Sequence, residues 1–265
     1  MPGNIRSVED LEELFDRHPD ADVIFHQAAQ VAVTDSVRDP REDFEINAVG
    51  TFNILETMRR KKVDGLLLYS STNKVYGNLD GEEILEEPTR YSLKNLPQGI
   101  NEKFPLDFLS PYGCSKGAAE QYVIDYARIY GLKTMVFRQS CIYGYHQFGI
   151  EDQGWVAWFT IAALFDFPIT IFGNGKQVRD VLFIDDLIDA YWMAVNNPAF
   201  HCGEVFNIWG LVSIVISGID RRSGTTLCKI RKSRDSILGV PRSGDQLVYV
   251  SDIKKAKEKL NWNPK

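Results

Sequence analysis

The run VDGLLLYSS (63–71) constrains the fold more than any other part of the chain, because its centre is apolar without alternation. Such a run is typical of a strand buried on both faces of a parallel sheet. ADVIFHQAA (21–29) and KTMVFRQSCIYG (133–144) also have the pattern of strands, and helical patterns at 41–62 and 110–130 stand between the three. This alternation predicts right-handed βαβ units in a doubly wound α/β sheet.

Side chains that can transfer protons occur at the end of one predicted strand and at the start of the helix that precedes the next. Tyr112 and Lys116 form a Y-x-x-x-K pair at the start of a predicted helix. Ser110 is its expected N-cap and Pro111 its first residue. Residues four apart share one helix face, and a nearby ammonium lowers the pKa of a phenol. With the hydroxyl of Thr72, at the end of an apolar strand, the pair suits removal of a proton from an alcohol while a cofactor accepts hydride.

The composition argues against several other classes of protein. The chain has 265 residues and a net charge of −6, which gives no indication of nucleic-acid binding. No run approaches the ~18 apolar residues that span a bilayer, and the first residues have no features of a secretion signal. The four cysteines are widely spaced, which fits free thiols in a reducing cytoplasm. The four histidines form no i,i+4 pair, so we expect no metal site.

Motifs along nearly the whole chain resemble the extended short-chain dehydrogenase/reductase superfamily, in its NAD-dependent nucleotide-sugar epimerase/dehydratase branch. They are HQAAQ (26–30), NAVGT (47–51), YSSTNKVYG (69–77), SPYGCSK (110–116), FRQSCIYG (137–144), FGNGKQVRDVLFIDD (172–186), PRSGDQ (241–246) and KKAKEKLNWNP (254–264). Within this branch the chain most resembles the CDP-paratose 2-epimerase family. Between Gly210 and Val240 the resemblance breaks down, and the sequence fits either a divergent insert or a frame-shifted stretch.

The resemblance implies a Rossmann-like sheet and a smaller C-terminal substrate-binding lobe. Residues 1–145 would form a partial NAD-binding domain, and residues 146–265 mainly the lobe, interleaved with late Rossmann elements near 172–210. Compared with the family, the first βα units and their glycine-rich phosphate turn are absent. The chain is therefore expected to bind NAD weakly and to aggregate. The G-x-G at Gly173–Gly175 is interpreted as a tight turn between extended segments.

The resemblance also implies roles for single residues. The catalytic residues would be Thr72, Tyr112 and Lys116. The NAD-binding residues would be Asn4, Ile5, Ala28, Ala29, Gln30, Asn47, Ser70, Tyr112, Lys116 and Cys141. The residues that bind the nucleotide sugar would be Thr72, Asn73, Ser140, Gln153, Gly154, Arg179 and Arg242. Simpler roles remain open: a strand cap for Thr72, packing for Ala28 and Ala29, an exposed helix face for Asn47. Asp185 is expected to cap the helix that follows it.

Asn73 and Lys74 favour epimerisation within this branch. Dehydratases of the superfamily carry an Asp-Glu pair directly after the Thr, and here the pair is neutral and basic. The implied reaction is transient oxidation of a nucleotide sugar by NAD and return of the hydride to the other face, with CDP-paratose as the favoured substrate. The alternatives are a 4-epimerase acting on a UDP-sugar, a dehydratase, or a catalytically impaired remnant.

Two helices of the sequence also suggest a homodimer. The helices at 41–62 and 111–130 carry more apolar and aromatic side chains than one sheet face can cover. Family members pair such helices in an intermolecular four-helix bundle. The side chains expected at this interface include Phe44, Leu55, Tyr122, Tyr126 and Tyr130.

Overall fold

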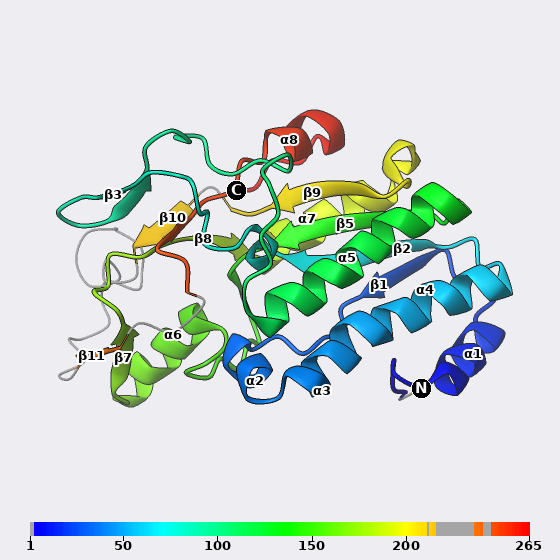
Figure 1. The fold of residues 1–265 in the computed structure, drawn as a ribbon, viewed down its shortest axis with the longest axis horizontal. Helices are drawn as coiled ribbons and strands as arrows, with labels where there is room; N and C mark the ends of the chain where they lie inside the picture. Colours follow the sequence, from blue (N-terminus) through cyan, green and yellow to red (C-terminus); the bar gives the residue numbers. More distant parts are fainter. Residues whose placement is uncertain (1–2, 211, 216–235, 241–244) are drawn as a thin grey trace.

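A four-stranded parallel sheet lies at the centre of the computed structural model, which describes residues 3–210, 212–215, 236–240 and 245–265. Its strands run in the order β1 (Val23–His26), β2 (Leu66–Thr72), β5 (Thr134–Gln139) and β9 (Glu204–Ile208) (Figure 1). Parallel pairing aligns the strands so that Thr72 lies opposite Gln139. The predicted parallel α/β sheet is therefore confirmed.

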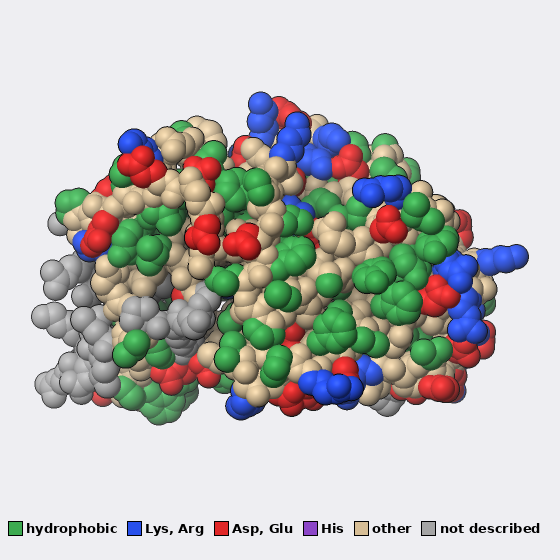
Figure 2. All heavy atoms as spheres, in the orientation of Figure 1, with side chains coloured by type: hydrophobic (Ala, Val, Ile, Leu, Met, Phe, Trp, Pro, Cys, Tyr) green, Lys and Arg blue, Asp and Glu red, His purple; other side chains and the backbone are tan. Residues whose placement is uncertain are grey.

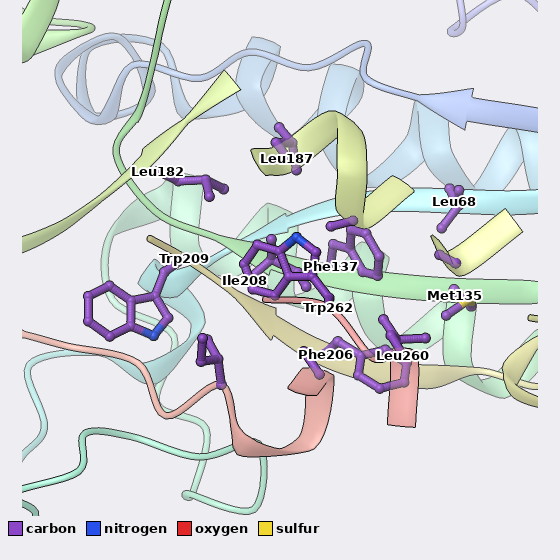
Figure 3. Packing of buried hydrophobic residues seen from close by; sticks show 14 of the residues in the cluster. Leu68, Met135, Phe137, Leu182, Leu187, Phe206, Ile208, Trp209, Leu260 and Trp262 are labelled. Carbon is purple, nitrogen blue, oxygen red and sulfur yellow. The ribbon is translucent and has the colours of Figure 1, made fainter. Parts of the chain in front are cut away.

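Helices cover both faces of this sheet, which explains why β2 is apolar throughout. Alternate strand residues point to opposite faces. Leu67 and Tyr69 pack under α1 (Val8–Arg17), α4 (Gly50–Lys61) and α5 (Ser110–Tyr130). Leu66 and Leu68 join the core beneath α7 (Ile184–Val195) and α8 (Lys254–Leu260), together with Phe137 and Trp262 (Figure 3).

The helical stretch predicted at 41–62 is present, but it is not one regular helix. It comprises α3 (Pro40–Phe44), the π-helical turn η1 (Glu45–Val49) and α4, and it follows the short helix α2 (Val33–Arg38). The backbone N–H of Glu42 donates to the Asp39 side chain, and Pro40 occupies the first turn, so this end is capped as helix starts commonly are.

Two other predicted helix starts differ in detail. Ser110 is the first residue of α5 and not its N-cap, which is Leu109, but its Oγ accepts a hydrogen bond from the N–H of Gly113 at 3.2 Å. Asp185 does not cap α7: the helix begins at Ile184 without a side-chain cap. The prediction for Asp185 is wrong because this carboxylate lies inside the first turn. From there it does not cap the helix, and it interacts favourably with the positive end of the helix dipole.

A second group of short strands follows the central sheet at its carboxyl end. β8 (Val178–Phe183) pairs with β6 (Ile142–Tyr143), β10 (Val212–Val215) and β12 (Val248–Tyr249), and β7 (Ile169–Phe172) pairs with β11 (Ser236–Gly239). The remaining elements are η2 (Asn73–Tyr76), β3 (Ile84–Glu86), β4 (Tyr91–Leu93), α6 (Trp155–Phe165) and η3 (Pro198–Phe200).

The predicted G-x-G turn joins two strands of this second group. Gly173 and Gly175 both have positive φ, at 83° and 76°, between β7 and β8. Backbone of this kind favours glycine, so the interpretation of this motif as a turn is confirmed. No helix in the described part of the chain is both long and apolar enough to cross a membrane.

Candidate active site

Polar residues at the carboxyl ends of the central strands line a cavity of about 440 Å³. Ligand sites of doubly wound sheets lie at this edge. Thr72 at the end of β2 lines the cavity with Tyr112 and Lys116 of α5. Its other predicted site residues are Ala29, Ser70, Asn73, Ser140, Cys141, Gln153 and Gly154. Side chains separated by forty residues in the sequence are thus brought together as predicted.

Tyr112 is buried, and its surroundings do not favour the phenolate. Burial raises the pKa of Tyr112 to about 12; a hydrogen bond with Thr72 acts in the opposite direction, and the Asp43 carboxylate raises it further. The prediction that Lys116 lowers this pKa is therefore wrong. Removal of the phenolate from water is the largest effect on this pKa, and the side chains that modify it are Thr72 and Asp43.

Thr72 has two roles in the geometry. Besides its contact with Tyr112, its Oγ1 accepts a hydrogen bond from the N–H of Lys74 at 3.2 Å. It therefore caps η2, as the simpler interpretation held, and still presents its hydroxyl to the cavity. Asn73 lies beside it, buried, and donates its amide to Gln246 at 3.0 Å.

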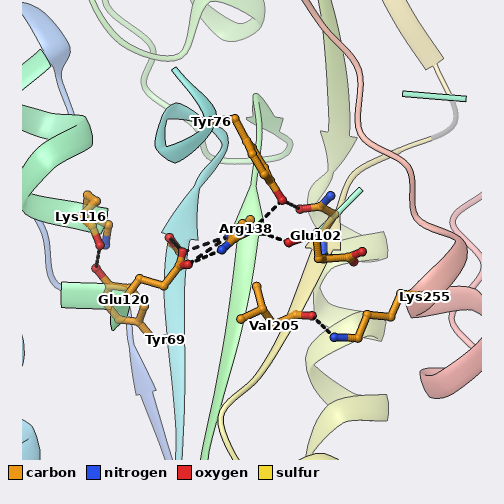
Figure 4. Close-up of polar contacts among 10 residues, drawn as sticks. Tyr69, Tyr76, Glu102, Lys116, Glu120, Arg138, Val205 and Lys255 are labelled. Carbon is orange, nitrogen blue, oxygen red and sulfur yellow. Dashed lines mark hydrogen bonds and ion pairs between the residues drawn. The ribbon is translucent and has the colours of Figure 1, made fainter. Parts of the chain in front are cut away.

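Lys116 is enclosed rather than solvated. Its Nζ lies 4.3 Å from the centre of the Tyr69 ring on β2. Burial lowers the pKa of Lys116 to about 7, and the carboxylates of Glu120 and Asp43 act against that decrease. Glu120 is itself held by Arg138 of β5 in a buried ion pair (Figure 4). The ammonium therefore depends on two buried carboxylates for its charge.

The loop after β1 approaches the same cavity. Ala28 is exposed and Ala29 is half-buried and lines the cavity, so packing does not explain both alanines. Asn47 is 1% exposed, which rules out the exposed helix face. Its Oδ1 accepts a hydrogen bond from the N–H of Gln30 at 2.9 Å, and its Nδ2 donates to the Gln30 carbonyl at 3.0 Å.

A second cavity of about 430 Å³ adjoins the first and shares Lys74, Cys141, Gln153 and Gly154 with it. Arg179 lies in its wall, 7% exposed, with Nη2 4.0 Å from a carboxylate oxygen of Asp245. Gln153 and Gly154 line both cavities and Arg179 lines the second, so these predicted substrate-binding residues lie around two adjoining cavities. Arg242 lies outside the described residues.

Five of the predicted residues that the structure describes line neither cavity: Asn4, Ile5, Ala28, Gln30 and Asn47. The N–H of Asn4 donates to Asp10 at 2.7 Å, and the Ile5 side chain packs beside Gly50. Cys141 lines both cavities with a positive φ of 34°. Burial raises the pKa of Cys141, so it is a poor nucleophile.

Lys74 and Asp245 line the cavities but were not predicted as site residues, and neither was Tyr191, which lies outside both linings. Lys74 and Asp245 lie 3.7 Å apart at their closest charged atoms, and Tyr191 hydrogen-bonds both Ser70 and Gln139. Lys74 and Asp245 belong to the motifs STNKVYG and PRSGDQ, so position within a motif could have indicated them. Tyr191 belongs to no such motif, and only the fold brings it to Ser70.

Comparisons with known proteins agree with this geometry. A sequence profile described as the NAD dependent epimerase/dehydratase family matches residues 1–208. CDP-paratose 2-epimerase of Salmonella typhi is 46% identical over 270 residues, covering 99% of this chain and 79% of that protein.

Two solved structures have the same fold. UDP-glucose 4-epimerase of Thermotoga maritima, solved with UDP-glucose, is 32% identical with a TM-score of 0.79, covering 99% of this chain and 78% of that one. UDP-glucose 4-epimerase of Thermus thermophilus, in complex with NAD, is 28% identical with a TM-score of 0.75 and the same coverage of both chains. The resemblance inferred from the motifs is confirmed, and with it the enzyme class and NAD as cofactor.

Proposed function

We propose that this chain, which belongs to the NAD dependent epimerase/dehydratase family, is an epimerase that inverts C2 of CDP-paratose. The observation that carries the proposal is the pair Asn73–Lys74, which lines the cavity beside Thr72 and Tyr112. An amide and an ammonium cannot supply the acidic pair that eliminates water in dehydratases. The 46% identity to CDP-paratose 2-epimerase over 99% of the chain supports the choice of sugar.

Tyr112 and Thr72 would act on the sugar hydroxyl at the reacting carbon. The Tyr112 phenolate takes the hydroxyl proton and later returns it, and the Thr72 hydroxyl orients the same oxygen. NAD, when bound, supplies the hydride acceptor and donor. Burial raises the pKa of Tyr112 to about 12 and the hydrogen bond with Thr72 acts against that increase, so Thr72 is the group that favours the phenolate.

The cavity has features that fit NAD. Ala28 and Ala29 are small side chains in the loop after β1, where a cofactor could approach the protein backbone closely, and Asn47 holds Gln30 of this loop in place. Lys116 and Ser70 offer an ammonium and a hydroxyl to ribose oxygens. Asn4 and Ile5 line neither cavity and are not included in this proposal.

The second cavity would hold the rest of the nucleotide sugar. Arg179 presents a guanidinium that can bind phosphate oxygens in a bidentate manner. Gln153 and Gly154 line both cavities, where a sugar would join its diphosphate. A ligand that spanned both cavities would contact Arg179 in the second and Tyr112 in the first.

Turnover of a set of nucleotide sugars tests the proposal. The purified protein with NAD is given CDP-paratose, UDP-glucose or dTDP-glucose in D₂O, and the products are identified by NMR. We expect inversion of CDP-paratose without deuterium at C2, because the hydride returns from the cofactor. Conversion of UDP-glucose alone would indicate a 4-epimerase, and a 4-keto product from dTDP-glucose would indicate a dehydratase; either result would contradict the proposal.

We also propose that the chain forms a homodimer through α4 and α5. Hydrophobic side chains gather on the face formed by these helices (Figure 2). The side chains of Phe52, Tyr122 and Tyr130 are 37%, 48% and 52% exposed there. The ring of each makes an edge contact with the ring of Tyr126. Leu55 and Tyr126 are not part of the exposed face: they are 0% and 6% exposed and belong to the core against the sheet, so their predicted place at the interface is wrong.

Light scattering tests the dimer. We expect twice the chain mass, and a monomer for Tyr122→Glu, because a carboxylate on this face cannot be buried without cost. A monomeric mass for the unmodified protein at high concentration would refute the proposal.

A further inference from the structure

Asp43 is a carboxylate buried beneath the start of α5. It is 1% exposed, and its Oδ2 accepts a hydrogen bond from Ser115 Oγ at 2.5 Å. Ser115 lies between Tyr112 and Lys116 in the sequence and is also 1% exposed. Removing a carboxylate from water costs free energy, so its hydrogen bonds at this position must offset that cost.

The other oxygen of Asp43 leads to the loop after β1. Oδ1 accepts a hydrogen bond from Asn47 Nδ2 at 3.1 Å, and the same Nδ2 lies 3.1 Å from Ser115 Oγ. Asn47 in turn is hydrogen-bonded to both the N–H and the carbonyl of Gln30. Asp43 therefore contacts both Ser115, on the helix of Tyr112, and Asn47, the residue that holds the Gln30 loop and also contacts Ser115 itself.

The π-helical turn η1 belongs to this arrangement. It contains Asn47 and directly follows α3, which ends one residue after Asp43. A π turn widens the helix by one residue per turn and is frequent at functional sites. Both Asp43 and Asn47 face Ser115 across this turn.

Asp43 also contributes to the electrostatics of Lys116. The charged and titratable groups around that ammonium include Asp43 from α3, Glu120 and Tyr112 from the same helix, the Tyr69 ring from β2 and His26 from β1. His26 is held neutral, since burial and Lys116 lower its pKa to about 3. The negative charges that act against the burial of Lys116 are thus those of Glu120 and Asp43.

We propose that Asp43 is a positioning residue that fixes the Tyr112–Lys116 turn of α5 and the Gln30 loop relative to each other. It acts through Ser115 on one side and Asn47 on the other, and it touches neither substrate nor cofactor. The inference rests on the proposed function, because it assumes that Tyr112 and the loop must meet the same cofactor. Fully satisfied buried networks of this kind hold side chains in a single arrangement.

Asp43→Asn tests the proposal, because it keeps the shape of the side chain and removes its charge. Ser115→Ala is the second variant, and Glu42→Gln, an exposed neighbour on α3, is the matched control. We expect Asp43→Asn and Ser115→Ala to weaken NAD binding and to lower kcat by roughly 10–100-fold, the effect of a small misplacement of reacting groups. The control should match the parent protein in both measurements.

Two further measurements separate positioning from general stability. In Asp43→Asn the pKa of Lys116 should fall further, so the alkaline limb of the kcat profile should move to lower pH. The amide of Gln30 should exchange with D₂O faster in Asp43→Asn and in Ser115→Ala than in the control. This exchange measurement needs no substrate, so it remains decisive if no nucleotide sugar is turned over. An Asp43→Asn protein with parental NAD affinity, pH profile and Gln30 exchange would overturn the proposal, even if its melting temperature were lower.

Discussion

Replacing Arg138 by Met should destabilise the protein far more than loss of an ordinary salt bridge. Arg138 and Glu120 are 4% and 0% exposed, and their closest contact, Nη2 to Oε1, is 2.5 Å (Figure 4). Nε adds contacts of 3.1 and 3.2 Å to the two carboxylate oxygens. Nη1 also donates to the Tyr76 hydroxyl at 2.7 Å, which donates to Asn207. The pair therefore links α5, β5 and the segment before β3.

The magnitude follows from the charge that is left behind. Arg138→Met leaves the Glu120 carboxylate buried with only the Ser71 hydroxyl as its remaining side-chain donor among the described contacts. Removing one partner of a buried pair typically costs about 3–5 kcal/mol. The Lys116 ammonium still acts on the Glu120 carboxylate, so we expect a loss near the lower end of that range. Glu120→Gln in the same protein removes that charge, so the double variant should recover at least half of the loss.

Urea denaturation followed by tryptophan fluorescence measures both variants. The exposed pair Arg128–Asp125, whose side chains are 70% and 51% exposed, provides the control, and Arg128→Met should change stability little. An Arg138→Met protein within about 1 kcal/mol of the parent would refute the argument. A double variant less stable than Arg138→Met would refute it equally, because relief of the buried charge would then have no effect.

Three further predictions concern the site and its support. Tyr112→Phe should lower kcat by about 10²–10⁴-fold with NAD affinity retained, and a near-parental rate in a steady-state assay would exclude its acid–base role. The pKa of His26 is lowered to about 3 by burial and Lys116, so the unfolded chain takes up a proton below about pH 6.5 that the folded protein excludes. Between pH 7 and pH 5 the parent should therefore lose roughly 2 kcal/mol more stability than His26→Gln, and parallel pH curves would contradict this. Gly117→Ala should destabilise by about 1–3 kcal/mol despite the better helix propensity of alanine, since a Cβ there would lie 2.4 Å from the Phe108 ring; an unchanged melting temperature would count against it.

The sequence determined the layers of the fold and the main members of the site. Alternate residues of a strand point to opposite faces, so the unbroken apolar run of β2 required helices on both sides of the sheet. Thr72 ends that strand, and Tyr112 and Lys116 are one helical turn apart, so local periodicity and the edge rule for parallel sheets were sufficient to bring them to one cavity.

Only the tertiary structure decided how these groups behave. The pKa of Tyr112 is raised although a lysine lies on the same helix face, because burial depends on every element around the phenol and not on its sequence neighbours. Leu55 was expected at an interface and lies in the core, because its burial also depends on the elements that pack around it. The contact of Asp43 with Ser115 joins residues 72 positions apart across a π turn. No local pattern encodes such a contact, since it exists only once the helices have packed.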